Sequence, residues 1–238
     1  MKKIYVILAI FLMTGCAEMQ QVLTNVASDY ASGNTGSSIN IAGGLKEALN
    51  NGIAKQVTKL TQTDGFYNNS LVRISLPDEL KVVEQGLRNI GLGSLADQGI
   101  KALNTAASDA VKEATPIFVN AVSTLTFSDA QAILMGSQDA ATQYLQRTTS
   151  QQLYQKFFPV VKNSFSKVGA DAIWREIITK YNAIPLVNPI NPDLNDYVTN
   201  KALEGVFKMI AIEEKNIRTD VNARTSTLLK QVFALQDK

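Results

Sequence analysis

Apolar residues from Gly44 onward recur three or four positions apart, and this spacing is the strongest constraint on the fold. It produces one apolar stripe on a helix, as between Leu45 and Leu60, where charged residues occupy most of the opposite side. Only residues 70–77, SLVRISLP, alternate as a strand does, and they have no comparable partner strand. The sequence therefore predicts an all-α, irregular multi-helix bundle of about nine helices, with 70–77 as an extended loop.

Capping residues, glycines and prolines divide this region into segments. We expect helices at about 44–64, 78–90, 94–125, 128–136, 137–147, 150–169, 170–184, 194–218 and 222–235. Asp78, Ser128 and Ser150 are the expected N-caps of three of them. Pro116 and Pro159 are expected to kink or break the helices that contain them. The segment 194–218 is apolar almost all round, which predicts a place at the centre of the bundle.

The first fifteen residues have the layout of an export signal. Lys2 and Lys3 precede an apolar run of about ten residues, roughly half the length that spans a membrane as a helix. The only cysteine, Cys16, follows Gly15 directly. This arrangement resembles the lipobox of bacterial lipoproteins, which implies that the Cys16 thiol is acylated and becomes the mature N-terminus. The alternative is a chance cysteine at the edge of an uncleaved segment.

The resulting domain organisation has three parts. Residues 1–15 are expected to be a lipoprotein signal peptide, 16–43 the lipidated cysteine with a flexible tether, and 44–238 a single all-helical domain. Ala17 stands where an aspartate would retain a lipoprotein in the inner membrane, and Glu18 is a lone acid. The resemblance therefore favours the periplasmic face of the outer membrane, with the lipid as the contact to the membrane.

Charge balance and missing residue types exclude several classes of function. The chain has 23 Lys and Arg against 21 Asp and Glu, and removal of Lys2 and Lys3 leaves an even balance. Because there is no basic excess, we expect no nucleic-acid partner. The absence of histidine excludes Ser-His and Cys-His nucleophiles and the common zinc sites, so we expect no metal and no cofactor.

The densest polar cluster lies at residues 137–150. Asp139, Gln143 and Arg147 are spaced by four, so they would share one face of a helix. Two interpretations remain open at this point. The cluster is either a solvent-facing helix with a terminal cap or the polar rim of a ligand groove.

Two long segments, PIFVNAVSTLTFSDAQAILMGSQDAATQYLQRTTS and YVTNKALEGVFKMIAIEEKNIRTDVNARTSTLLKQVF, resemble a bacterial family known as domain of unknown function 4197. The resemblance covers about residues 44–234 and implies an exported, all-helical protein, without an established activity. Charged and polar residues in these motifs are candidates for a ligand site or an interior polar network. They are Asp129, Asp139, Thr142, Tyr144, Arg147, Thr148, Glu204, Glu213, Glu214, Arg218 and Arg224.

These observations favour a non-enzymatic, membrane-anchored envelope lipoprotein of unknown molecular function. We expect it to bind an apolar or amphipathic, lipid-like ligand or an envelope protein, because kinks at Pro116 and Pro159 can leave a groove in a bundle. One alternative is an enzyme that uses Asp139, Tyr144 and Arg147, or the Glu213–Glu214 region. Another is a structural or assembly factor that acts through its surface alone.

Overall fold

The computed structural model describes residues 40–89, 91, 93–167 and 193–237, together with isolated positions between 168 and 192. By its internal contacts the chain divides into Met1–Ile39 and Asn40–Lys238, and the fold below is that of the second unit. The expected signal peptide, Cys16 and nearly all of the expected tether lie outside the described residues. The described domain begins with the first turn of a helix at Ile41, which Asn40 caps through its side chain.

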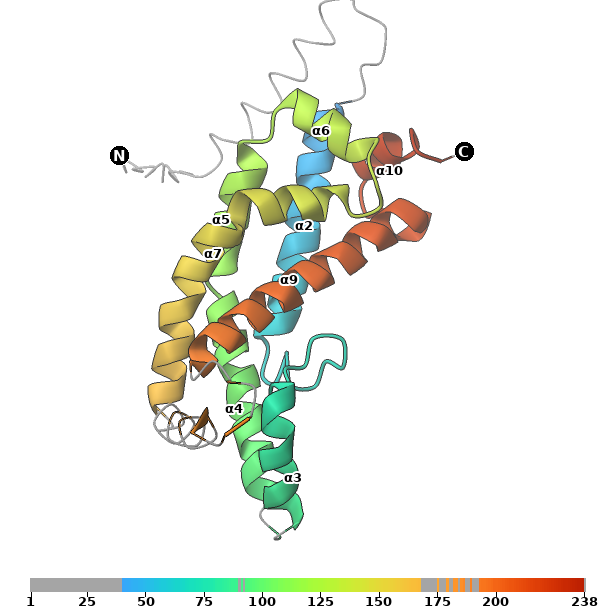
Figure 1. The fold of residues 1–238 in the computed structure, drawn as a ribbon. Coiled ribbons are helices and arrows are strands. Elements are labelled where there is room, and N and C mark those ends of the chain that lie inside the picture. The colour runs from blue at the N-terminus through green and yellow to red at the C-terminus, as the bar shows by residue number, and fades with distance from the viewer. Residues whose placement is uncertain are drawn as a thin grey trace, which may run out of the picture. The chain divides into compact units, whose positions relative to one another are not determined.

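Helices succeed one another along the described chain (Figure 1). They are α2 (Ile41–Thr61), α3 (Lys81–Asn89), α4 (Gly93–Val111), α5 (Ala114–Ser123), α6 (Phe127–Leu134), α7 (Ala140–Lys167), α9 (Leu194–Thr219) and α10 (Thr227–Phe233), with 3₁₀ turns η1 (Asp78–Leu80) and η2 (Val221–Ala223). The described residues form no strand, so the all-α prediction is confirmed. In that part of the chain seven α-helices have eight or more residues and α10 has seven, whereas the sequence predicted about nine.

The two helices expected at 137–147 and 150–169 are one continuous helix, α7. Ser150 does not cap a new helix, because its hydroxyl donates to the Gln146 carbonyl one turn earlier, at 2.6 Å. Thr148 and Thr149 make the same kind of bond, an arrangement that bends helices without ending them. Figure 1 shows α7 changing direction along its length. Pro159 lies inside α7 and does not end it, and the helix expected at 170–184 lies largely outside the described residues.

The helix expected at 94–125 is divided into α4 and α5, as the proline predicted, but the break lies at 112–113, before Pro116. Pro116 occupies the first turn of α5, where a missing backbone N–H leaves no intrahelical bond unmade. Like Ser150, the other two expected N-caps were wrong. The N-cap of α6 is Thr126, not Ser128, and Asp78 lies in the turn η1 and pairs with Lys81.

Helix α9 is the centre of the bundle, as its apolar sequence predicted. It packs against α2, α4 and α7, and Figure 1 shows it crossing α2 at an angle. Its core side chains include Phe207, whose ring meets Phe118 of α5 edge-to-face at 5.8 Å. Among the described helices none alone is long and apolar enough to cross a membrane. Only Gly93–Ser123 combined with Phe127–Leu134, bent by 106°, meets those requirements of length and composition.

The chain between α2 and η1 returns along α9 as an irregular segment. Its anchor is Phe66, whose side chain is fully buried against Gly205 of α9. A Cβ at position 205 would lie 2.6 Å from Phe66 Cε1, so glycine lets this segment approach the helix closely. The predicted extended loop 70–77 begins with a turn at 70–72, because the amides of Val72 and Arg73 donate to the Asn69 carbonyl, and the chain is extended only over 73–77.

Candidate functional site

Two of the candidate residues, Glu214 and Arg218, form a buried ion pair one turn apart on α9. Their nearest side-chain atoms are 2.8 Å apart, and the side chains are only 6% and 5% exposed. The Glu214 carboxylate accepts hydrogen bonds from the backbone amides of Ala141 and Thr142 and from the Thr142 hydroxyl, at 2.8–2.9 Å. Since these amides begin α7 and have no intrahelical acceptor, Glu214 caps that helix from a distant part of the chain.

Arg218 caps the C-terminal end of α6, the helix that precedes the turn leading into α7. Its guanidinium donates to the carbonyls of Ile133 and Leu134 at 2.9 and 3.0 Å, and these carbonyls end α6. The side chain of Gln236 also donates to the Leu134 carbonyl. The Glu214–Arg218 pair therefore fixes the end of α6 and the start of α7 together, and we call Thr142, Glu214 and Arg218 the polar clamp.

Glu213 and Arg224 serve other structural contacts. The Glu213 carboxylate accepts from Lys55 at 2.6 Å and from Gln56 at 2.8 Å, which joins α9 to α2. Arg224 is 2% exposed and donates to the carbonyls of residues 217 and 218 at the end of α9. Its two bonds to Asp237, at 2.6 and 2.7 Å, raise the pKa of Arg224 and lower that of Asp237. Glu213 and Glu214 thus engage different partners.

The acidic candidates near α6 and α7 act in local turns. Asp129 forms a capping box with Thr126, whose hydroxyl and amide lower the pKa of the Asp129 carboxyl. Asp139 accepts from the Ser137 hydroxyl at 2.7 Å, and this bond, with help from Gln143, lowers its pKa. Both carboxyls are therefore held ionised by turn contacts and are not prepared to donate a proton.

The remaining candidates of the 137–150 cluster do not meet in a cleft. Arg147 and Thr148 are exposed, and the Thr148 hydroxyl bonds to its own helix. The Tyr144 hydroxyl reaches only the Ala121 carbonyl, at 3.4 Å. This geometry fits a solvent-facing helix better than the rim of a ligand groove.

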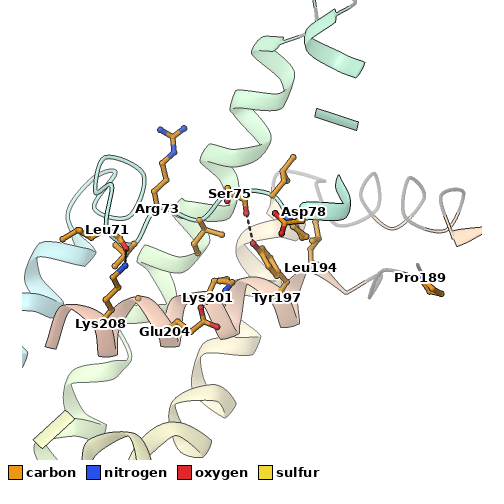
Figure 2. Close-up of a pocket in the computed structure, with 15 residues that line it drawn as sticks. Leu71, Arg73, Ser75, Asp78, Pro189, Leu194, Tyr197, Lys201, Glu204 and Lys208 are labelled. Atoms are coloured by element: carbon orange, nitrogen blue, oxygen red, sulfur yellow. Dashed lines mark hydrogen bonds and ion pairs between the residues drawn. The ribbon is translucent and has the colours of Figure 1, made fainter. Parts of the chain in front are cut away.

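A groove of about 640 Å³ lies elsewhere, between residues 71–78 and one face of α9 (Figure 2). The α9 residues that line it recur at helical spacing and are Leu194, Tyr197, Lys201, Glu204, Gly205 and Lys208. Glu204 is the only one of the eleven candidate residues from the two sequence motifs that lines the groove. Sequence reasoning missed the groove, although the alternation in 71–76 indicated that every second residue faces outward.

The outer wall of the groove is an extended backbone held from both sides. The side chains of Val72, Ile74 and Leu76 point into the core. Asn104 of α4 takes the place of a neighbouring strand, because it accepts from the Ile74 amide at 2.8 Å and donates to the Ile74 carbonyl at 2.7 Å. From α9, the Tyr197 hydroxyl donates to the Ser75 carbonyl at 2.9 Å, as Figure 2 shows.

The charges along the groove are unevenly paired. Glu204 pairs with Lys201 at 2.6 Å, and Asp78 pairs with Lys81 at 2.7 Å. Lys208, which is exposed, donates to the Leu71 carbonyl at 2.8 Å and forms no ion pair within the described residues. Arg73 lies over the ring of Tyr67, 4.2 Å from its centroid. The carboxylates of the groove are therefore paired, whereas Lys208 is a cation without a carboxylate partner among the described residues. Figure 2 shows the Arg73 side chain pointing away from α9.

The described residues contain no cluster of three or more histidine, cysteine, aspartate or glutamate side chains that could hold a metal ion. The carboxylates of the polar clamp and of Glu213 are occupied by hydrogen-bond donors. The groove contains two carboxylates, each in an ion pair at the surface. The arrangement is suited to recognition of a polar chain more than to proton transfer.

Comparison with known proteins gives a family but no relative of known activity. No curated protein and no solved structure matches the chain. The model of one family, described as "Protein of unknown function (DUF4197)", matches residues 35–234. That match spans the α2–α10 region that contains both the polar clamp and the groove. The chain therefore belongs to this family.

Proposed function

We propose that this protein is a lipid-anchored protein of the cell envelope that acts by binding, and that its groove receives part of a protein partner. The observation that supports a peptide-like occupant is the groove's outer wall, which is extended backbone. Most of the opposite wall consists of charged and polar side chains from α9, with Leu194 and Gly205 as its apolar members. An apolar ligand would be better served by a wall of aliphatic and aromatic side chains.

An enzymatic role is the weaker candidate. The candidate acids Glu213 and Glu214 are buried, but each is committed to contacts that join helices. Asp139 is exposed in the turn before α7, Arg147 is exposed on α7, and Tyr144 turns toward α5. Two hydroxyls do meet carboxylates, Thr142 at Glu214 and Ser137 at Asp139, but the first pair is buried where it caps α7 and the second belongs to a surface turn. This geometry supports binding over catalysis.

The anchor is proposed from the sequence, and it is tested by labelling growing cells with palmitate. We expect the full chain to incorporate the label and to fractionate with membranes, because Cys16 follows a lipobox-like segment. A Cys16→Ser variant should lose both the label and the membrane association. Since Cys16 is the only thiol, label retained by the variant would contradict the assignment.

Binding in the groove is tested by placing a photoreactive benzoylphenylalanine in cells. Leu71 lies at the edge of the groove and is 48% exposed, so the probe there should form a defined cross-link to one envelope protein. Val82 of α3 is the matched control, because it is an exposed apolar residue, 71% exposed, that does not line the groove. Equal cross-linking at both positions, or none at Leu71, would refute groove binding. Cross-linking to lipid at Leu71 would favour the amphipathic-ligand hypothesis.

A further inference from the structure

The backbone of residues 73–75 has one side that is already paired and one that faces the groove. In an extended chain the amide and carbonyl of one residue point to the same side, and those of the next residue point to the opposite side. The amide and carbonyl of Ile74 point to Asn104 of α4. The Ser75 carbonyl points to Tyr197 of α9, so the Ser75 amide and the Arg73 carbonyl also face the groove.

Those two groups have no hydrogen-bond partner among the described residues. The Ser75 carbonyl is used by Tyr197, and the Arg73 amide donates to Asn69 at 2.8 Å. Of the backbone groups on the groove side, only the Ser75 amide and the Arg73 carbonyl therefore remain available to a ligand. Their placement matches the two groups that a parallel strand needs from its neighbour, since one residue opposite Ile74 would bond to both.

The charge of Lys208, at the Leu71 end of this extended segment, indicates which kind of side chain a ligand would place there. Lys208 holds the Leu71 carbonyl with one of its three donors, and its side chain is exposed. The groove's own carboxylates, Asp78 and Glu204, are each paired with another lysine. An acidic side chain is therefore the complement that Lys208 lacks, and a basic one would meet an uncompensated cation.

We propose that the partner enters the groove as a short extended segment that pairs with the edge of residues 73–75 and places an acidic side chain beside Lys208. One residue of that segment donates its amide to the Arg73 carbonyl and accepts from the Ser75 amide. The bonds to Tyr197 and Lys208 stay in place at either end, so the pairing covers about three residues. This inference rests on the proposed groove-binding function.

The test uses a phage library of random peptides selected against the full chain in lipid nanodiscs. We expect the selected peptides to combine β-branched residues with aspartate or glutamate. A fluorescein-labelled peptide from this selection is then titrated against the protein by anisotropy. Backbone nitrogens of that peptide are then methylated one at a time. Only methylation of the amide that donates to the Arg73 carbonyl should abolish binding.

Two variants of one residue separate backbone pairing from other contacts. Ser75→Pro removes the free amide, and the extended backbone at Ile74 is the conformation that precedes proline most readily, so the fold should be retained. We expect it to weaken peptide binding about tenfold, the loss that corresponds to one backbone hydrogen bond. Ser75→Ala keeps the amide and should bind as the natural chain does. Lys208→Met should weaken binding and reduce its dependence on salt.

The peptide and cross-linking experiments test backbone pairing, the charge of the ligand and the proposed function separately. Equal binding of the peptide to Ser75→Pro and Ser75→Ala would overturn backbone pairing, and selection of basic peptides would overturn the assigned charge. Failure of the library to yield any peptide, with cross-linking at Leu71 intact, would show that the groove takes a folded surface. Failure of the Leu71 cross-link itself would refute the proposed function instead. Circular dichroism of each variant verifies that the helices are unchanged.

Discussion

Replacement of Arg218 by methionine is expected to lower the free energy of unfolding by about 3–5 kcal/mol, the usual cost of removing one partner from a buried ion pair. Methionine fills a similar volume but donates no hydrogen bond. Glu214 would then remain buried without its arginine partner. The carbonyls of Ile133 and Leu134 would each lose the donor that Arg218 supplies and keep only the Gly136 amide and the Gln236 side chain, respectively. Urea denaturation followed by circular dichroism measures the loss as a lower midpoint with an unchanged slope.

The matched control is another Glu–Arg pair with the same spacing. Glu84 and Arg88 lie on α3, and the Arg88 side chain is 41% exposed and also contacts Asp97. Because water replaces the lost contacts there, Arg88→Met should have a much smaller effect than Arg218→Met. Equal losses for the two variants would show that the polar clamp does not hold the α6–α7 turn.

The helical content of the domain was predictable because each helix has an apolar stripe of its own. The stripe of α9 is broad enough to place it at the centre without any knowledge of its neighbours. Boundaries were less predictable, since local signals compete with burial. Ser150 looks like a cap in the sequence, yet Thr149 and Leu153 continue one buried face across it, and α7 therefore stays intact.

The roles of the candidate residues were not predictable from their spacing. Glu214 and Arg218 are four apart, which indicates a pair, but the spacing alone does not distinguish a solvated pair from a buried one. Their decisive partners, Thr142 and Leu134, lie more than seventy positions earlier in the chain. The groove was not predictable for the same reason: its walls come from residues 71–78 and from α9, which are far apart in the sequence.

Replacement of Asn104 by leucine is expected to destabilise the domain by about 2–6 kcal/mol and to loosen the wall of the groove. The variant leaves both the amide and the carbonyl of Ile74 without partners, at a residue that is 2% exposed. Each unsatisfied buried group costs about 1–3 kcal/mol. Urea denaturation measures the total loss of unfolding free energy, and hydrogen exchange of the amides of residues 71–77 shows whether the loss arises in that segment. The Ile74 amide should exchange slowly in the natural chain and rapidly in the variant.

Ser108→Ala on the same helix is the control for removing a buried polar group from α4. The Ser108 hydroxyl is buried and has no hydrogen-bond partner among the described residues, so its loss should leave the stability almost unchanged or slightly higher. If Asn104→Leu behaves like Ser108→Ala, then Ile74 is not held by Asn104. If instead exchange rises in residues 71–77 while the α7 and α9 amides stay protected, Asn104 is the residue that keeps the groove's edge extended. The same variant should then bind an extended peptide more weakly, because the edge must be ordered before it can pair.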